Sequence, residues 1–430
     1  MDDLFQGLPF SPAEILLPRD CEYGKWAVVA CDQYTSQPEY WQRVEEYVGA
    51  APSALRLILP ESCLDGPNVE TDIMDIDNTM SRYLRDGRFD VHPDALVYVE
   101  RTLHNGKLRK GLVGKVDLER YDYEPGSGSA IRATEGTVMS RIPPRVAVRK
   151  NAPIELPHIM MLTDDPEKTV IDPLTARKDK MQELYNFDLM ENGGHLAGWL
   201  LDGESMALVA AAFRALNAPA AFQKRYGLTT DEPVLHFAMG DGNHSMATAK
   251  ECYERQKKLT PPEEWATLPS RYALCEVVNL HDDSLEFEPI HRVVFGVKPR
   301  DLLDALLKAF PGAVEGESGA KGAHVLRYVW EKGTGAVTVP KPAAQLPVGT
   351  LQGFLDDYVK THRGSVDYIH GADVTAELGG QPGNIGFLLP PMGKEQLFPT
   401  VIHDGVLPRK TFSMGEANDK RFYLEARRIR

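Results

Sequence analysis

The sequence predicts an α+β fold, because short apolar runs typical of buried strands alternate with segments whose apolar residues recur at helical spacing. Residues 28–30 and 55–59 are such runs, and residues 40–48 show the helical spacing. The pair Asn105-Gly106 separates two further apolar runs and favours a hairpin, because both residues tolerate positive φ. A chain of 430 residues is too long for one ordinary core and predicts two or three domains.

Further elements of the first half follow from the same two periodicities. Helices are expected at residues 73–83 and 209–216. Strands are expected at residues 96–99, 111–114 and 159–162. Pro60 should end the strand at 55–59, and the Gly- and Ser-rich residues 124–129 should form a loop.

In the second half, an apolar run at residues 234–239 predicts a strand that leads through a glycine turn into a helix at 246–253. The remaining expected elements are strands at 272–280 and 386–389, helices at 302–310 and 351–358, and a loop or linker at 332–349. Asp301 is placed to cap the helix at 302–310.

Composition excludes several classes of protein. The chain is 43% hydrophobic and 26% charged, which is typical of a globular protein. Its net charge of −14 argues against non-specific binding of nucleic acid, which needs a basic face. No apolar run reaches the length of a membrane span, so no membrane partner is expected.

Cysteine usage and the N-terminus indicate a cytoplasmic protein. The five cysteines are odd in number and include no C-x-x-C pair, so they are expected as free thiols, without a structural zinc site. The start, Met1-Asp2-Asp3-Leu4, lacks the basic and hydrophobic stretches of a signal peptide.

The most informative segment is Gly240-Asp241-Gly242-Asn243-His244-Ser245. A strand, a glycine turn and a helix start direct backbone N–H groups and the positive end of a helix at one point, which suits an anion such as phosphate. Asp241 and His244 add an acid and an imidazole. The alternative is a polar connector in which Asn243 or Ser245 caps the helix.

Other signatures of nucleotide and hydrolase sites do not match. Gly114-Lys115 lacks the upstream glycine of a P-loop. Ser245 stands where the dinucleotide fingerprint has its third glycine. The chain contains neither H-E-x-x-H nor G-x-S-x-G.

The segment 241–245 resembles the signature of one family, a strand ending in Asp-Gly-His-His-Arg before a helix. Three further segments match the same family: residues 57–61 resemble its early strand ending in Pro-Glu, residues 289–292 its Pro-x-His-Arg, and residues 407–411 its Pro-x-Lys-Ser-Thr without the serine. Over most of its length the chain therefore resembles the family called domain of unknown function 1015. That family is related to the ParB/sulfiredoxin-like nucleotide-binding fold, which also includes free-serine kinases.

The resemblance implies a ParB/sulfiredoxin-like core at residues 126–300, between N- and C-terminal α/β segments at 1–125 and 301–430. The core would contain a helical insertion, since Glu135 and Asp241 are far apart in the chain. Glu135 matches the glutamate of an upstream His-Glu pair, although Thr134 replaces the histidine. In the related kinases that glutamate is thought to act as a base toward the substrate hydroxyl. Without the resemblance, Glu135 reads as a surface residue near arginines.

Two departures from the family signature bear on the chemistry. Ser245 replaces an arginine, so the turn lacks a guanidinium for phosphate, and Arg132, Arg141, Arg292 or Lys410 would have to supply the charge. Asn243 replaces a histidine and removes one proton carrier.

The resulting hypothesis is phosphoryl transfer from ATP or ADP to a small hydroxyl compound, with free L-serine as the first candidate by resemblance. The expected catalytic residues are Glu135, Asp241 and His244, and Asp241 would also hold Mg²⁺. The expected nucleotide- or phosphate-binding residues are Gly240, Gly242, Asn243, Ser245, Arg132, Arg292 and Lys410. The alternatives are a nucleotide-binding regulatory protein without turnover and, third, a metabolite-binding protein without nucleotide.

Overall fold

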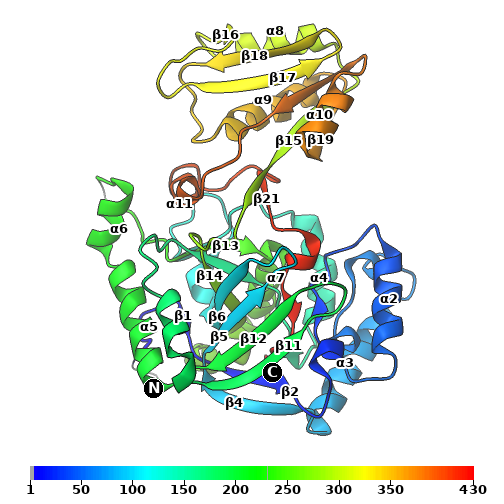
Figure 1. The fold of residues 1–430 in the computed structure, drawn as a ribbon, viewed down its shortest axis with the longest axis vertical. Coiled ribbons are helices and arrows are strands. Elements are labelled where there is room, and N and C mark those ends of the chain that lie inside the picture. Colours follow the sequence, from blue (N-terminus) through cyan, green and yellow to red (C-terminus); the bar gives the residue numbers. More distant parts are fainter. Residues whose placement is uncertain (1–3, 230) are drawn as a thin grey trace. The chain divides into compact units, whose positions relative to one another are not determined.

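The computed structural model describes residues 4–229 and 231–430, and the chain divides into two compact units. The first unit comprises Met1–Leu285 and Gly415–Arg430, and the second comprises Glu286–Met414 (Figure 1). This division differs from the three predicted segments, because residues on both sides of position 125 contribute strands to one sheet.

The first unit is built around a large mixed sheet. In the part of the chain that the structure describes, ten strands form it, in the order β11 (Gln182–Asp188), β12 (His195–Leu200), β5 (Val97–Thr102), β6 (Leu108–Asp117), β14 (Tyr272–Asn279), β10 (Met160–Thr163), β13 (Phe237–Asp241), β8 (Ile131–Arg132) and β7 (Tyr121–Asp122), with β1 (Phe10–Ser11) beside β6. The pairs β10–β14, β13–β8 and β7–β8 are parallel and the others are antiparallel. The predicted α+β fold is confirmed.

Two hydrophobic cores cover the two faces of this sheet. Val97 and Val99 of β5 belong to one core, whereas Leu96 and Tyr98 belong to the other, as the alternation of side chains along a strand requires. The first core contains side chains of α2 (Pro38–Val48) and α3 (Val69–Arg85). The second contains side chains of α5 (Gly203–Leu216) and α7 (Asn243–Lys257).

Three short two-stranded pairings tie the chain ends into the first unit. They join β2 (Ala13–Pro18) to β4 (Phe89–Ala95), β3 (Val28–Val29) to β22 (Phe422–Tyr423), and β9 (Ile154–Glu155) to β23 (Arg427–Arg428). The remaining α-helices of this unit are α1 (Tyr23–Trp26), α4 (Ile142–Arg149) and α6 (Pro219–Tyr226). Its 3-10 helices are η1 (Ala54–Arg56), η2 (Glu61–Cys63), η3 (Leu118–Arg120), η4 (Met139–Arg141), η5 (Asp172–Lys180), η6 (Pro262–Thr267), η7 (Pro269–Arg271) and η9 (Ala417–Asp419).

The second unit contains an antiparallel sheet and four α-helices among its residues, all of which the structure describes. The strand order is β16 (Val314–Glu315), β18 (Gly333–Val339), β17 (His324–Trp330), β20 (Asn384–Leu388), β15 (Phe287–Phe295) and β19 (Ser365–His370), with β21 (Phe412–Met414) beside β15. The helices are α8 (Pro299–Ala309), α9 (Pro347–Thr361), α10 (Ala372–Gly379) and α11 (Leu397–Asp404), with a 3-10 helix η8 (Lys394–Gln396) before α11.

Several local predictions are wrong, for identifiable reasons. Residues 55–59 form no strand: Ser53 accepts a hydrogen bond from the Leu55 N–H and starts η1, and the apolar run is buried without pairing. Residues 332–349 are not a linker, because Gly333–Val339 is β18, where Gly335 packs against the ring of Tyr328. Asp301 lies inside α8, which begins at Pro299.

The predicted helical insertion is mixed rather than helical. Between Glu135 and Asp241 the chain forms α4, α5 and α6, but it also supplies β10, β11 and β12 to the main sheet. The Asn105-Gly106 hairpin is confirmed, since β5 and β6 pair on either side of it. The five cysteines are free, as predicted.

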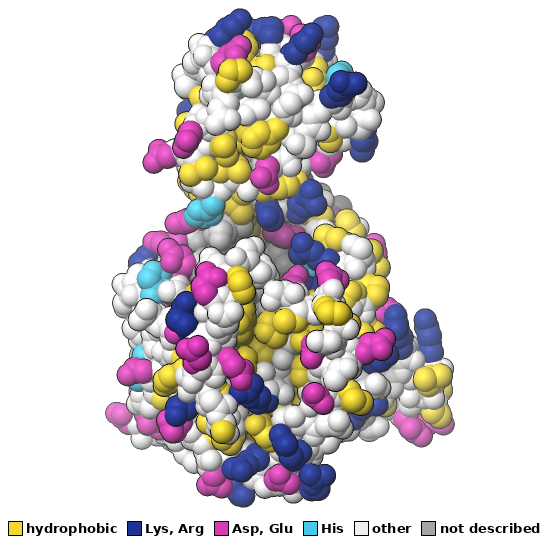
Figure 2. Space-filling view, turned by 90° about the vertical axis from the view of Figure 1, so that its right-hand side faces the viewer, with side chains coloured by type: hydrophobic (Ala, Val, Ile, Leu, Met, Phe, Trp, Pro, Cys, Tyr) yellow, Lys and Arg dark blue, Asp and Glu magenta, His cyan; other side chains and the backbone are white. Residues whose placement is uncertain are grey.

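Two further features are the distribution of charged side chains on the surface and the length of the apolar helices. On the face drawn in Figure 2, acidic and basic side chains are interspersed. No single helix in residues 4–229 and 231–430 is long and apolar enough to cross a membrane, and only α5 and α6 taken together, with a bend of 54°, reach that criterion.

Candidate functional site

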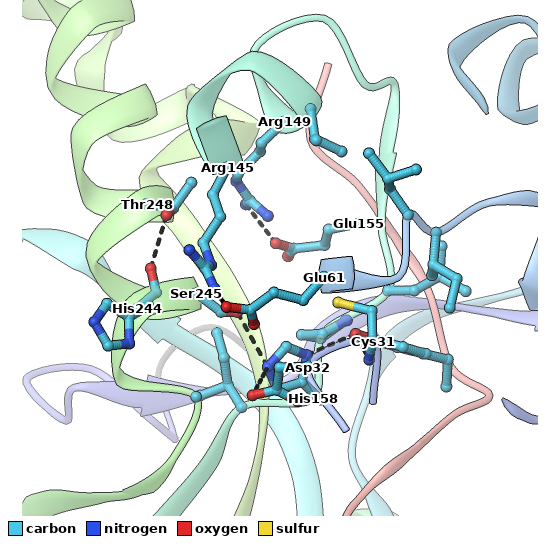
Figure 3. A pocket seen from close by; sticks show the side chains of 18 of the residues that line it. Cys31, Asp32, Glu61, Arg145, Arg149, Glu155, His158, His244, Ser245 and Thr248 are labelled. Carbon is cyan, nitrogen blue, oxygen red and sulfur yellow. Dashed lines mark hydrogen bonds and ion pairs between the residues drawn. The ribbon is translucent and has the colours of Figure 1, made fainter. Parts of the chain in front are cut away.

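The main cavity of the first unit encloses about 340 Å³, which lies in the range of small-molecule sites. It is lined by the loop after β3, residues 57–64, Glu135, α4, the segment before β10 and the turn between β13 and α7 (Figure 3). Six of the predicted site residues line it together: Glu135, Asp241, Gly242, Asn243, His244 and Ser245. Segments far apart in the sequence therefore meet around the predicted turn.

The β13–α7 turn has the predicted strand–glycine–helix form. β13 ends at Asp241, Gly242 adopts φ +81°, and α7 begins at Asn243. A Cβ at Gly242 would lie 3.1 Å from the Cα of Ile159, so both the positive φ and the close approach require glycine. Neither side chain considered as a cap has that role: among the described residues Oδ1 of Asn243 has no partner, and Oγ of Ser245 lies 3.2 Å from Nε2 of His158.

The backbone amides of the turn are mostly available to an anion. The Gly242 N–H donates to Oδ1 of Asp241 at 2.9 Å, so that amide is engaged. Among the described residues, no acceptor is bonded to the N–H groups of Asn243, His244 and Ser245, which form the first turn of α7. Three amides at the positive end of a 15-residue helix can therefore bind one anion.

Two polar side-chain atoms on this first turn are buried without a partner within the described residues. They are Oδ1 of Asn243 and Nε2 of His244. Burial lowers the pKa of His244, and the positive charges of Arg145 and Arg141 lower it further. The imidazole is consequently neutral at pH 7 and can donate or accept one hydrogen bond toward a ligand.

The two predicted carboxylates, Glu135 and Asp241, are held by neighbouring strands. The Thr134 hydroxyl donates to the Met239 carbonyl at 2.8 Å and so ties the segment after β8 to β13. Oδ2 of Asp241 pairs with the ammonium group of Lys420 at 3.2 Å. Lys420, from the C-terminal segment, thus places a cation beside the turn, which no sequence motif indicated.

Arg141 also lines the cavity, but the other predicted ligands, Arg132, Gly240, Arg292 and Lys410, do not. The Arg132 guanidinium is buried and donates to the carbonyls of Ser129 and Pro233, each at 2.9 Å, so it supports a loop instead. Gly240 packs inside the sheet, where a Cβ would lie 3.0 Å from Leu162.

Arg292 and Lys410 belong to the second unit, whereas the cavity is lined by the first. Buried Arg292 donates to Oε1 of Gln352 at 2.9 Å and to the Lys410 carbonyl at 2.9 Å. Arg292 is thus part of the interior of the second unit, whereas the Lys410 side chain is exposed, with its Nζ 5.6 Å from the centre of the Tyr368 ring.

A histidine network that the sequence did not indicate lies beside the turn. His158 is buried; its Nδ1 lies 2.7 Å from the Tyr423 hydroxyl, and its Nε2 lies 3.2 Å from Oγ of Ser245. Oδ2 of Asp32 lies 3.8 Å from the same Nε2. Burial alone would raise the pKa of Asp32, but His158 and its other partners outweigh it and lower that pKa.

The carboxylates fit a magnesium ion only together with phosphate oxygens. In the described ranges, no three His, Cys, Asp or Glu side chains are grouped to hold a metal by themselves. Mg²⁺ is commonly bound by one or two carboxylates plus the phosphates of its nucleotide. Asp241 is the residue of the turn that would provide a carboxylate ligand to the ion, and its Oδ2 pairs with Lys420 in this structure.

A family model described as "Protein of unknown function (DUF1015)" matches residues 12–358. The chain belongs to this family. The family predicted from the Asp-Gly segment is thereby confirmed. No curated protein matches the chain.

Among solved structures, the DUF1015 chain is similar to a conserved hypothetical protein from Pyrococcus furiosus, with 12% identity, a TM-score of 0.36, and coverage of 73% of this chain and 94% of that chain. It is also similar to a free serine kinase in complex with AMP, with 11% identity, a TM-score of 0.37, and coverage of 72% and 90%. A variant of such a kinase in complex with ADP gives 10% identity, a TM-score of 0.39, and coverage of 74% and 92%. Similarity at this level does not carry a function from one protein to another.

Proposed function

We propose that this protein transfers a phosphoryl group from ATP or ADP to a small hydroxyl compound, with free L-serine as the first acceptor to test. The observation that carries the proposal is the meeting of Glu135, Asp241 and the open first turn of α7 in one cavity. Serine itself enters only through the resemblance of the Asp-Gly segment to the free-serine kinases.

Each part of the turn has a role in this proposal. The N–H groups of Asn243, His244 and Ser245 hold phosphate oxygens, and the helix end stabilises their negative charge. Neutral His244 contributes a hydrogen bond from its unpartnered Nε2. When Mg²⁺ is bound with the phosphates, it neutralises part of their charge.

Glu135 acts on the acceptor. Its carboxylate accepts the proton of the acceptor hydroxyl as the hydroxyl oxygen bonds to phosphorus and the bond between phosphorus and the bridging oxygen of the nucleotide breaks. The products are a phosphate monoester and a nucleotide shorter by one phosphate. Because phosphoryl transfer needs positioning more than covalent catalysis, the cavity walls and the amides supply most of the effect.

The experiment is a comparison of binding and turnover in wild type and Glu135→Gln. Nucleotide affinity is measured by calorimetry, and phosphoserine formation by phosphorus NMR. We expect affinity to change less than about twofold, while turnover falls about 100-fold or more, the usual range for loss of a general base. Wild-type turnover in Glu135→Gln would show that another group is the base.

A second candidate is a regulatory protein that binds nucleotide without turnover. It is favoured by the two altered motif positions, Asn243 and Ser245, and by Lys420, which already neutralises Asp241 at 3.2 Å. Nucleotide binding without product from any tested hydroxyl compound, in the presence of magnesium, would support it over the kinase.

A further inference from the structure

A phosphate at the first turn of α7 would meet no arginine on α7 itself, because Ser245 stands at the family's arginine position. Backbone amides bind phosphate more strongly when a guanidinium also contacts it. Three arginines line the cavity, Arg141, Arg145 and Arg149, all from η4 and α4, and α4 packs against α7. One of these three can replace the missing side chain.

Arg149 is held by an ion pair with a buried carboxylate. Its Nη2 lies 2.5 Å from Oε2 of Glu155, whose side chain is 1% exposed. Glu155 also accepts from the Leu274 N–H at 2.8 Å and pairs with Arg427 at 2.7 Å. Withdrawing Arg149 would leave a buried carboxylate short of one partner, which is costly.

Arg145 is held in a way that permits exchange. Its Nη2 lies 2.7 Å from Oε1 of Glu61, and the two side chains are 17% and 24% exposed. Figure 3 shows both side chains pointing toward each other in the pocket. Its Nη1 donates to the Arg141 carbonyl at 2.8 Å, which steadies the guanidinium on its own helix.

The Arg145 guanidinium can exchange the Glu61 carboxylate for a phosphate at a small cost in free energy. A guanidinium that leaves a carboxylate for a phosphate keeps an anionic hydrogen-bond acceptor. Glu61 can turn toward water, because its side chain is already partly exposed, while its backbone N–H stays bonded to the Cys31 carbonyl at 2.8 Å. The charge of Arg145 already acts at the turn, where it adds to burial in lowering the pKa of His244.

We propose that Arg145 binds a phosphate group of the nucleotide and that Glu61 competes with this phosphate for the guanidinium. The nucleotide in this statement rests on the proposed function. The phosphate subsite itself does not, because Arg145 and the open amides of α7 would bind inorganic pyrophosphate equally well.

Titration calorimetry with ADP and with pyrophosphate, on the full-length chain, tests the proposal. Arg145→Ala should weaken both ligands about tenfold or more, as expected for loss of a charged hydrogen bond, and Arg145→Lys should weaken them less. Glu61→Gln should tighten both about threefold to tenfold by removing the competitor. The control is Arg255→Ala, which breaks an exposed pair with Glu251, 2.7 Å apart on α7 but outside the cavity.

The double variant Glu61→Gln/Arg145→Ala separates competition from a general charge effect. If Glu61 acts through Arg145, the double variant binds like Arg145→Ala alone. If Glu61→Gln tightens binding equally without Arg145, the competition is wrong. Melting curves establish that each variant is folded.

The outcomes distinguish this inference from the proposed function. ADP binding that Arg145→Ala leaves unchanged overturns the inference and spares the proposed function. Pyrophosphate binding that depends on Arg145, without any ADP binding, supports the inference and overturns the proposed function. Binding of neither ligand to the wild type overturns both.

Discussion

Replacing Gly242 with alanine adds one methyl group where β13 turns into α7, and the structure allows its cost to be worked out. Gly242 has φ +81°, a conformation that costs alanine about 1–2 kcal/mol. Alanine also restricts the unfolded chain more than glycine does, which offsets about 0.4–1 kcal/mol of this cost. The new Cβ would also lie 3.1 Å from the Cα of Ile159 and 3.4 Å from its Cγ1. Overpacking of this kind costs about 1–3 kcal/mol more.

Gly106 provides a matched control for the backbone part of this cost. It has φ +79°, and no described heavy atom beyond its chain neighbours lies within 4 Å of an added Cβ. Gly106→Ala should therefore destabilise the first unit by about 1 kcal/mol, and Gly242→Ala by about 2–4 kcal/mol. The difference between the two variants isolates the contact with Ile159.

The assay is urea unfolding followed by tryptophan fluorescence. Four of the five tryptophans belong to the first unit, so Trp330→Phe makes the signal specific to it. Both glycine variants are compared in the Trp330→Phe background. If the dependence of the unfolding free energy on urea concentration is unchanged, a shift in midpoint reports a change in stability. Equal destabilisation of the two variants would refute the reasoning, since it would mean that Ile159 imposes no steric limit on the turn.

Two further predictions concern pH. Burial alone would raise the pKa of Glu155, but Arg427 and Arg149 outweigh it and lower that pKa below 4.5, so its contribution to stability is present above pH 4.5 and is lost as pH falls through the folded pKa. Glu155→Gln should lower the free energy of unfolding by about 3 kcal/mol at pH 7 and reduce its loss at acid pH, both measured by urea unfolding. The same loss of stability at acid pH in variant and wild type would contradict this role of Glu155. Burial and then Arg145 lower the pKa of His244 below 6.5, so the unfolded chain takes up a proton first and stability falls as pH drops below 6.5. His244→Gln should lose less stability than wild type between pH 7 and pH 5, and an identical decline in both proteins would count against a neutral buried imidazole.

The sequence pattern predicted the turn between β13 and α7, which is formed by residues that are close together in the chain. The run before Gly240 and the glycines at 240 and 242 indicated a strand, a turn and a helix start, and β13 and α7 meet there as expected. Glu135 joined them only through the family resemblance, because no spacing rule connects positions so far apart. The resemblance also named Arg292 and Lys410, which belong to the second unit, where Arg292 is buried and the Lys410 side chain is exposed.

The parts of the site that were missed depend on long-range packing. Asp32, His158 and Tyr423 come from three distant segments, and the pairing of β22 with β3 brings the last of them to the cavity. The failure at residues 55–59 has a related cause: an apolar run reports burial, and it cannot tell a paired strand from an extended segment that covers a core.

Hydrogen–deuterium exchange at the start of α7, with and without ADP and magnesium, tests the central claim most directly. The amides of Asn243, His244 and Ser245 have no acceptor among the described residues, so they should exchange rapidly in the free protein. We expect saturating ADP to slow the exchange of a peptide that contains these three amides, and Arg145→Ala to reduce that protection. If ADP binds while these amides exchange at the same rate as in the free protein, the phosphates are held elsewhere.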